Sequence, residues 1–291
     1  MCGRYASARK RIELLEEFSV QSDRTGEPLA PDYNVAPTKP VYAVLTRQPD
    51  ARDSSRAGSR SGDADGAVAD LGDAGEAASQ RQLRVIRWGL VPFWAKDVKI
   101  GSRMINARAE TVAEKPAFRR AFAQRRCLLP ADGYYEWQQH EGKPKQPIYI
   151  SRADGRSLAF AGLYELWRDA TVPPDDADAW LWTTTIITTS APDDLGHIHD
   201  RMPMLIDTAS WGEWLDPANR DVSDLRGLLV PAMVSGLTTY PVSTAVNSVR
   251  NNGPELIEPI DPGLAQPLAA GRARAPRDGA HPRDTGNDAL F

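Results

Sequence analysis

The sequence predicts an α+β fold, a single domain with a curved, mostly antiparallel, barrel-like β-sheet flanked by short helices. After residue 82, short runs rich in β-branched and aromatic residues dominate, each bounded by Gly, Pro or Asp. Helical periodicity is confined to a few short segments. Neither an alternation of strands with long helices nor a Gly-rich phosphate loop is present, so a parallel nucleotide-binding sheet is excluded.

The first predicted element is a helix over Ser7–Phe18, because Ile12, Leu15 and Phe18 recur at helical spacing. A turn-rich passage over Pro31–Thr38 follows. The expected strands are Val41–Thr46, Leu83–Trp88, Met104–Ala109, Arg126–Leu129, Tyr134–Gln138, Ile148–Ser151, Leu158–Leu163 and Trp182–Thr189. The later expected helices are Pro116–Gln124, Ser210–Leu215 and Ser223–Leu229.

Two segments contain too few large apolar residues to offset the entropy of ordering them, and both are expected to be disordered. They are Arg47–Gln82, an insertion that lengthens a hairpin loop, and the tail Asp261–Phe291. A long hairpin loop costs little extra, because closure entropy grows only logarithmically with length. The remaining chain forms one domain over residues 2–260.

The amino-acid composition excludes several classes of function. Lys and Arg number 35 against 39 Asp and Glu, a net charge of −4, so nucleic acid can be bound only through a local basic patch. Two cysteines and four histidines exclude a disulfide scaffold and leave little material for a metal centre; we expect neither metal nor cofactor. No apolar run approaches the roughly 20 residues of a membrane span, which predicts a cytoplasmic protein.

Cys2 is the most informative position, because removal of Met1 would leave a thiol and a free α-amine on adjacent carbons. Their ordinary pKa values, about 8.5 and about 7.7–8.0, leave both partly deprotonated near neutral pH. The amine condenses with an aldehyde to an imine, and the thiolate closes on the imine carbon to give a thiazolidine. The alternative is a cysteine that follows the initiator by chance.

Two strand motifs carry polar groups suited to chemistry. Glu136 lies among aromatic residues, which favour a protonated carboxyl and make it a candidate general acid or base, although strand alternation could equally direct it to solvent. Asn106 and Arg108 share one face of a strand, where an amide and a guanidinium are suited to a phosphate or a carbonyl oxygen. A solvated strand face is the alternative for this pair.

His199 lies in a Pro-bounded loop and is followed by Asp200 and Arg201, an order suited to proton transfer beside an anion; a surface loop histidine is the alternative. Trp94 belongs to an aromatic and basic stretch and is a candidate for stacking on a base. Cys127 lies in an apolar run and is interpreted as an inert core thiol.

Six motifs together resemble the SOS response-associated peptidase family, the abasic-site processing proteins. They are Met1–Tyr5 (MCGRY), Tyr33–Thr38 (YNVAPT), Trp88–Pro92 (WGLVP), Ile105–Thr111 (INARAET), Cys127–Trp137 (CLLPADGYYEW) and Ile198–Pro203 (IHDRMP). The resemblance implies capture of abasic sites in single-stranded DNA as a covalent cross-link on Cys2, with Met1 removed first by the self-cleavage that the family's peptidase name denotes. It implies a monomer that needs no cofactor, contacts no membrane and associates with the nucleoid when DNA-bound.

The resemblance also implies residue roles. Cys2 would be the nucleophile, Asn106 would position it and the lesion, Glu136 would act as acid and base, and His199 would protonate the sugar ring oxygen. The residues implied in DNA binding are Arg4, Asn34, Pro37, Trp94, Arg108 and Arg201. Ala95 departs from the pattern, since a second aromatic residue follows the tryptophan in some members.

Two other functions remain open. A liberated N-terminal cysteine also serves glutamine-dependent amidotransferases, although the tail is too short and too polar to be an ammonia-accepting synthase domain. A non-catalytic DNA-binding module is the third reading. A cross-link to abasic DNA that requires Cys2 distinguishes the first function from both alternatives.

Overall fold

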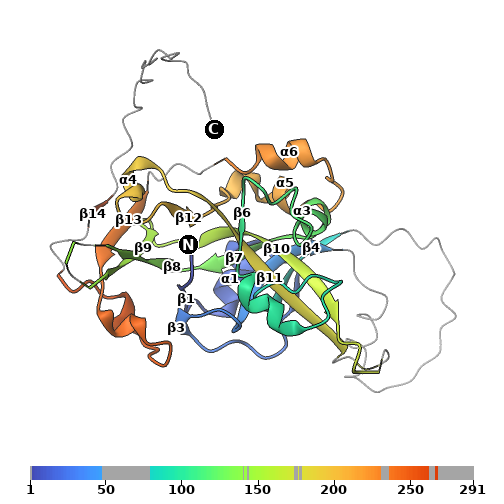
Figure 1. Ribbon diagram of the computed structural model, residues 1–291, viewed down its shortest axis with the longest axis horizontal. Coiled ribbons are helices and arrows are strands. Elements are labelled where there is room, and N and C mark those ends of the chain that lie inside the picture. The colour runs from blue at the N-terminus through green and yellow to red at the C-terminus, as the bar shows by residue number, and fades with distance from the viewer. Residues whose placement is uncertain are drawn as a thin grey trace, which may run out of the picture.

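Five strands close into a barrel in the order β11-β10-β7-β4-β5, with β5 returning to β11 (Figure 1). The computed structural model describes residues 2–47, 79–139, 141–142, 144–173, 176, 179–230, 236–261 and 266–267. All barrel pairings are antiparallel except the closing one, in which Thr183 and Thr184 of β11 lie parallel to Arg87 and Trp88 of β5. The predicted barrel-like α+β fold is therefore confirmed.

The barrel strands are β4 (Pro40–Arg47), β5 (Gln80–Trp88), β7 (Arg126–Ala131), β10 (Leu158–Arg168) and β11 (Trp180–Ser190). Three short strands extend this sheet: β2 (Ser22–Arg24), β6 (Asn106–Arg108) and β12 (Arg201–Pro203). The second sheet has the order β14 (Gln266–Pro267), β13 (Leu237–Pro241), β9 (Gln146–Arg152), β8 (Gly133–Gln138), β1 (Tyr5–Ser7) and β3 (Asp32–Val35).

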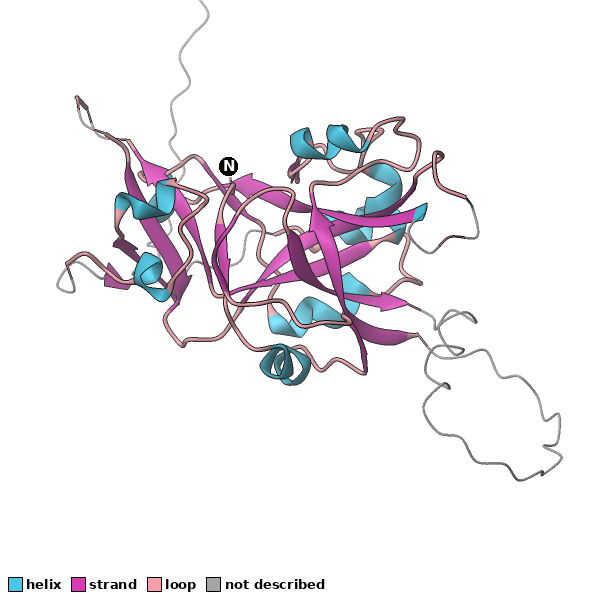
Figure 2. Cartoon of the chain, turned by 90° about the horizontal axis from the view of Figure 1, so that it is seen from below, coloured by secondary structure: helices cyan, strands magenta, loops and turns pink. Residues whose placement is uncertain are grey.

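Short helices lie outside the strands, some over the barrel and others against the second sheet (Figure 2). The α-helices are α1 (Arg11–Glu17), α3 (Arg119–Gln124), α4 (Asp193–Gly196), α5 (Trp211–Leu215) and α6 (Val222–Gly227). The 3₁₀ helices are η1 (Val98–Arg103), η3 (Thr208–Ser210), η4 (Thr244–Asn247) and η5 (Pro254–Ile257). Within the described residues, no helix has the length and apolar content needed to cross a membrane.

Strand alternation divides the barrel side chains between two cores. One set, which includes Leu129, Phe160 and Ile186, packs inside the barrel with Cys2 and Tyr5 from the amino-terminal segment. The alternate set packs outward against the helices, and it joins Leu14 and Phe18 of the α1 region to the tryptophans of α5, with Phe18 stacked on Trp211 at 4.4 Å between ring centroids. The amino-terminal segment is thus part of the interior of the barrel.

Most predicted elements are confirmed in kind, and the errors lie at their ends. The first helix begins at Arg11, because Tyr5–Ser7 is strand β1, and Ile12 is 67% exposed. Leu14 and Phe18, four residues apart, form the buried stripe instead. Part of the passage predicted as turns, Asp32–Val35, is strand β3, which pairs with β1.

The β4–β5 hairpin is confirmed, but it extends into the segment expected to be disordered, because Arg47 pairs with Gln80. The rest of that segment, residues 48–78, lies outside the described residues. In the tail, Gln266 and Pro267 pair with β13, so disorder was wrong for these two positions. Most of the remaining tail also lies outside the described residues.

Gly89 sets the direction in which the chain leaves the barrel after β5. Its φ is +115°, and an added Cβ would lie 2.6 Å from the carbonyl oxygen of Gly101. We expect Gly89→Ala to lower the free energy of unfolding by about 2–4 kcal/mol, through backbone strain and this clash. Gly155→Ala is the control, because Gly155 has φ +71° but nothing within 4 Å of its Cβ position, and it should cost only about 1 kcal/mol in a denaturant titration. Equal losses would contradict the close approach.

Candidate active site

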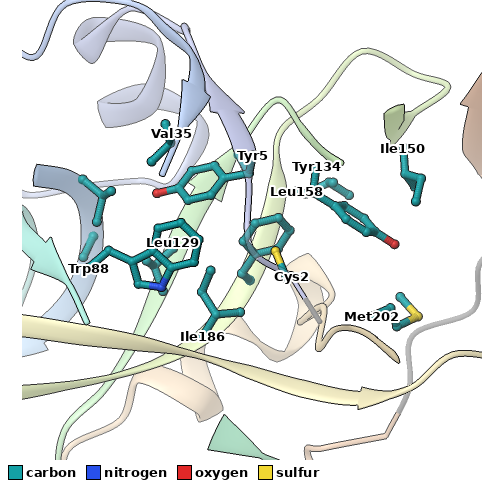
Figure 3. Packing of buried hydrophobic residues seen from close by; sticks show 14 of the residues in the cluster. Cys2, Tyr5, Val35, Trp88, Leu129, Tyr134, Ile150, Leu158, Ile186 and Met202 are labelled. Atoms are coloured by element: carbon teal, nitrogen blue, oxygen red, sulfur yellow. The ribbon is translucent and has the colours of Figure 1, made fainter. Parts of the chain in front are cut away.

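Cys2 lies in the core inside the barrel because β1, which follows it, is paired on both sides. Tyr5 of β1 lies opposite Tyr134 of β8 and opposite Val35 of β3. The antiparallel register carries the residues before Tyr5 alongside the residues after Tyr134, toward Glu136. The Cys2 side chain is fully buried in the cluster that contains Tyr134 and Met202 (Figure 3).

Asn106 fixes the backbone of Cys2. Its strand, β6, lies parallel to β11 with Asn106 opposite Ile186, and its Nδ2 donates to the Cys2 carbonyl oxygen at 2.8 Å. The other end of the amide, Oδ1, is buried and has no hydrogen-bond partner among the described residues. Because buried acceptors are usually hydrogen-bonded, Asn106 Oδ1 can accept a hydrogen bond from a ligand that binds beside Cys2.

Glu136 faces the same interior, which settles the alternation in β8. Tyr134 and Glu136 point into the barrel core, whereas Tyr135 and Trp137 pack on the opposite face of the sheet. The Glu136 side chain is 3% exposed. Burial raises its pKa from 4.5 to about 7, and the negative charge of Asp200 acts in the same direction.

The thiol of Cys2 is held neutral in this environment. Burial raises its pKa well above the ordinary range, and the negative charge of Glu136 raises it further. Cys127 is also fully buried, and burial raises its pKa to about 12, as expected for the core thiol that the sequence predicted. The two cysteines therefore differ in their neighbours rather than in burial, since the negative charge of Glu136 acts on Cys2, whereas Cys127 has a hydrogen bond with Thr184.

His199 is half-buried at the edge of this group. The backbone N–H of Arg201 donates to its Nδ1 at 2.9 Å, so the neutral ring carries its proton on Nε2. The Asp200 carboxylate lies 2.8 Å from the same Nδ1 but is 85% exposed, and it suits the protonated ring. Burial lowers the pKa of His199, against the opposing charge of Asp200, so the Nε2-protonated neutral form is favoured.

Arg4 and Asn34 form one network that anchors the amino-terminal segment to η4. Arg4 Nη1 donates to Asn34 Oδ1 at 2.7 Å and to the Val246 carbonyl oxygen at 2.9 Å. Asn34 Nδ2 donates to the carbonyl oxygens of Val246, Ser248 and Asn251, and the side chain is fully buried. Asn34, expected at a DNA channel, lies behind the site and shapes it through Arg4.

The other two predicted arginines differ from each other. Arg201 is held by Glu110 through both carboxylate oxygens, at 2.6 and 3.0 Å, and also donates to the Thr188 carbonyl oxygen at 2.7 Å. Arg108 is exposed on β6, two residues from Asn106. Of the two guanidinium groups, that of Arg108 is the more open to a ligand.

Pro37 and Trp94 lie on separate loops. Pro37 is half-buried in the turn before β4, next to Thr38, whose φ of +74° is unusual for a β-branched residue. Trp94 is 50% exposed, and its segment is held on β10 by a hydrogen bond from Trp167 Nε1 to the Ala95 carbonyl oxygen at 2.7 Å. The exposure predicted for Trp94 is present, whereas Trp88 is fully buried.

Three interactions around the site were not predicted from the sequence, although Glu110 was expected on the same strand face as Asn106 and Arg108. Glu110 pairs with Arg201 across 91 residues, and the η4 carbonyl groups receive Arg4 across more than 240. No local sequence pattern predicts either contact, because the partners are far apart in the chain. Lys145, whose positive charge is a minor influence lowering the pKa of both Glu136 and His199, is likewise an exposed lysine with no sequence signal.

Comparison with known proteins gives consistent results. The sequence pattern of the family described as SOS response associated peptidase (SRAP) matches residues 1–249. Abasic site processing protein YoqW of Bacillus subtilis (strain 168) is 38% identical over 258 residues, which cover 89% of this chain and 99% of YoqW. Abasic site processing protein HMCES of Gallus gallus is 35% identical over 216 residues, covering 66% of this chain and 62% of that protein.

Solved structures share the fold. A crystal structure of a Bacteroides thetaiotaomicron protein superposes with a TM-score of 0.66 at 25% identity, covering 89% of this chain and 99% of the other. A Bordetella bronchiseptica protein, at 23% identity, superposes with a TM-score of 0.60 over 83% of this chain. With the family pattern matched over nearly the whole chain and the relatives aligned along most of its length, this chain belongs to the SOS response associated peptidase (SRAP) family.

Proposed function

We propose that this chain processes abasic sites in single-stranded DNA by capturing the lesion covalently on Cys2. The observation that carries the proposal is the hydrogen bond from Asn106 to the Cys2 carbonyl oxygen, beside a buried Glu136 whose pKa is near neutral. The relatives named abasic site processing proteins support the choice of an abasic site as the substrate. The chain acts as a monomer, and its place in the cell is with the DNA in the cytoplasm.

The reaction starts from a neutral, buried thiol. While Met1 is attached, the Cys2 nitrogen is an amide and cannot condense with an aldehyde. Hydrolysis of the Met1–Cys2 bond, the peptidase step, frees the α-amine. The amine then adds to the ring-opened aldehyde of the lesion and loses one water to give an imine. Addition of the sulfur to the imine carbon, with the thiol proton passing to nitrogen, closes the thiazolidine.

Three side chains serve these proton movements. Glu136, with a pKa of about 7, exists in both forms near neutral pH and can take a proton from one intermediate and return it to another. Asn106 keeps Cys2 in place, and its open Oδ1 accepts from the freed amine or a sugar hydroxyl. His199 presents Nε2–H, the donor needed at the sugar ring oxygen, and also assists strand cleavage when the enzyme acts as a lyase.

The exposure of each side chain indicates which of the predicted residues can contact DNA. Arg108 binds a backbone phosphate next to the lesion, and Trp94 stacks where the bases separate, without a second aromatic residue at Ala95. Arg4, held from behind by the buried Asn34, presents the exposed part of its guanidinium to a phosphate, and the half-buried Pro37 lines the channel. A phosphate at Arg201 competes with the Glu110 carboxylate for the same two nitrogens.

Cys2→Ala is expected to abolish a denaturation-resistant complex with a single strand carrying one abasic site. Loss of Met1, measured as intact mass, must precede cross-linking in the wild-type chain. Cys127→Ala is the matched control, since that thiol is equally buried but lies away from Glu136, and it should cross-link normally. A Cys2→Ala chain that still cross-links, or a wild-type chain that reacts with Met1 retained, would overturn the proposal.

Glu136→Gln should stabilise the folded chain above neutral pH while slowing cross-linking. Because the folded pKa is raised from 4.5 to about 7, the stability associated with the protonated carboxyl is present at low pH and lost as pH rises through about 7. Glutamine does not ionise. We expect the variant to gain about 3 kcal/mol over wild type near pH ~8.5 and almost nothing near pH ~4.5, in urea titrations. A difference independent of pH would show that Glu136 does not carry this shift.

Arg108→Ala should weaken capture of DNA in a salt-dependent manner and leave the thiol reactive toward a small aldehyde. Removing one phosphate contact should lower the slope of log affinity against log salt by about 0.7 for a single strand. Arg119→Ala, on α3, is the control for loss of an exposed charge. An unchanged slope in Arg108→Ala would assign the phosphate elsewhere.

A further inference from the structure

A cavity lies away from Cys2, toward the other end of the barrel strands. Its volume is about 900 Å³, within the range of small-ligand sites. Tyr164 of β10 lines it, four residues and about 13 Å along the strand from Phe160, whose ring packs against Tyr5 and Tyr134 near Cys2. None of the four residues proposed for catalysis lines this cavity.

The cavity is basic although the chain is acidic. Four arginines line it, Arg47, Arg120, Arg125 and Arg220, against a single acidic residue, Glu165, while the whole chain has a net charge of −4. Glu165 is 3% exposed, and its Oε2 is already bound by Arg125 Nη2 at 2.7 Å. The Glu165 carboxylate is therefore neutralised at the wall. Among the described residues, no other carboxylate lines the cavity beside the exposed Arg120 and Arg220.

Two aromatic side chains border the same space. Phe93 is 49% exposed and Trp180 is 46% exposed, which is unusual for residues of this size. The Arg120 guanidinium lies over the Phe93 ring, 4.5 Å from its centroid. Arg125 adds a buried Nε with no hydrogen-bond partner among the described residues. Flat apolar faces next to guanidinium donors match a group that carries both a base and a phosphate.

We propose that this cavity binds nucleoside phosphates, with Arg120 and Arg220 on the phosphate and Phe93 or Trp180 against the base. Two sources share that chemistry: a free nucleotide, or the undamaged strand that continues from a lesion held at Cys2. Binding of the continuing strand rests on the proposed function and extends it. Phe93 is adjacent in sequence to Trp94, the residue proposed to stack beside the lesion, so one strand could pass from one to the other. The strand would then be held at two points on one molecule.

The test measures binding of an undamaged 5′-fluorescein-labelled single strand of about 15 nucleotides to the full chain, by anisotropy over a range of salt. The variant is Arg120→Glu/Arg220→Glu. The control is Lys115→Glu/Arg119→Glu, which makes the same charge change on exposed residues at the start of α3 that do not line the cavity. A second arm titrates deoxyadenosine monophosphate alone and follows tryptophan fluorescence. Thermal melts confirm that both variants are folded.

If the strand is the ligand, the cavity variant binds it at least about ten-fold more weakly, with a shallower salt slope, while the control behaves as wild type. If the source is a free nucleotide, the mononucleotide titrates the wild type and control but not the cavity variant. Equal effects of both variants, or no effect in either arm, would overturn the inference. Undamaged DNA cannot cross-link, so failure of Cys2 chemistry leaves this result unaffected.

Discussion

The site depends on one strand that has more partners than an ordinary barrel strand. β11 pairs with four strands. It pairs with β10 and, to close the barrel, with β5; it also pairs with β6, and near its carboxyl end with β12. β6 carries Asn106, and β12 begins two residues after His199. Two catalytic candidates far apart in sequence are thus set by hydrogen bonds to the same backbone, so their separation cannot change without opening the barrel.

The sequence predicted the parts of this arrangement whose signals are local. Apolar alternation located the long barrel strands. The motifs also identified Cys2, Asn106 and Glu136, which the fold connects through the hydrogen bond from Asn106 to the Cys2 carbonyl oxygen and the charge of Glu136 acting on the Cys2 thiol. It did not predict β1 and β3, because three or four residues carry too little periodicity to be distinguished from a turn. The extent of the β4–β5 hairpin was also underestimated, since polar residues near its tip pair through their backbones rather than through packing.

The sequence alone could not predict which face of β8 the Glu136 side chain occupies, because that depends on tertiary contacts. Alternation in β8 gives two opposite faces, and both are packed: one against the barrel core and one against Tyr149 and η4. Only the pairing of β8 with β1 decides which face receives Glu136 and brings it to Cys2. Burying a carboxyl beside a thiol costs stability that an apolar residue would not, and the positive groups around it offset only part of this. Proteins commonly retain such a cost where the group has chemistry to perform.

The anchoring of Arg4 on Val246 has a consequence for biosynthesis. The amino-terminal segment leaves the ribosome first, yet the carbonyl groups that hold Arg4 and Asn34 belong to residues 246–251, which are made last among the contacts of the site. A nascent chain that ends before them has the amino-terminal segment but lacks the carbonyl groups that hold it. Docking of the amino-terminal segment therefore comes late in synthesis, so incomplete translation products that lack residues 246–251 carry it undocked.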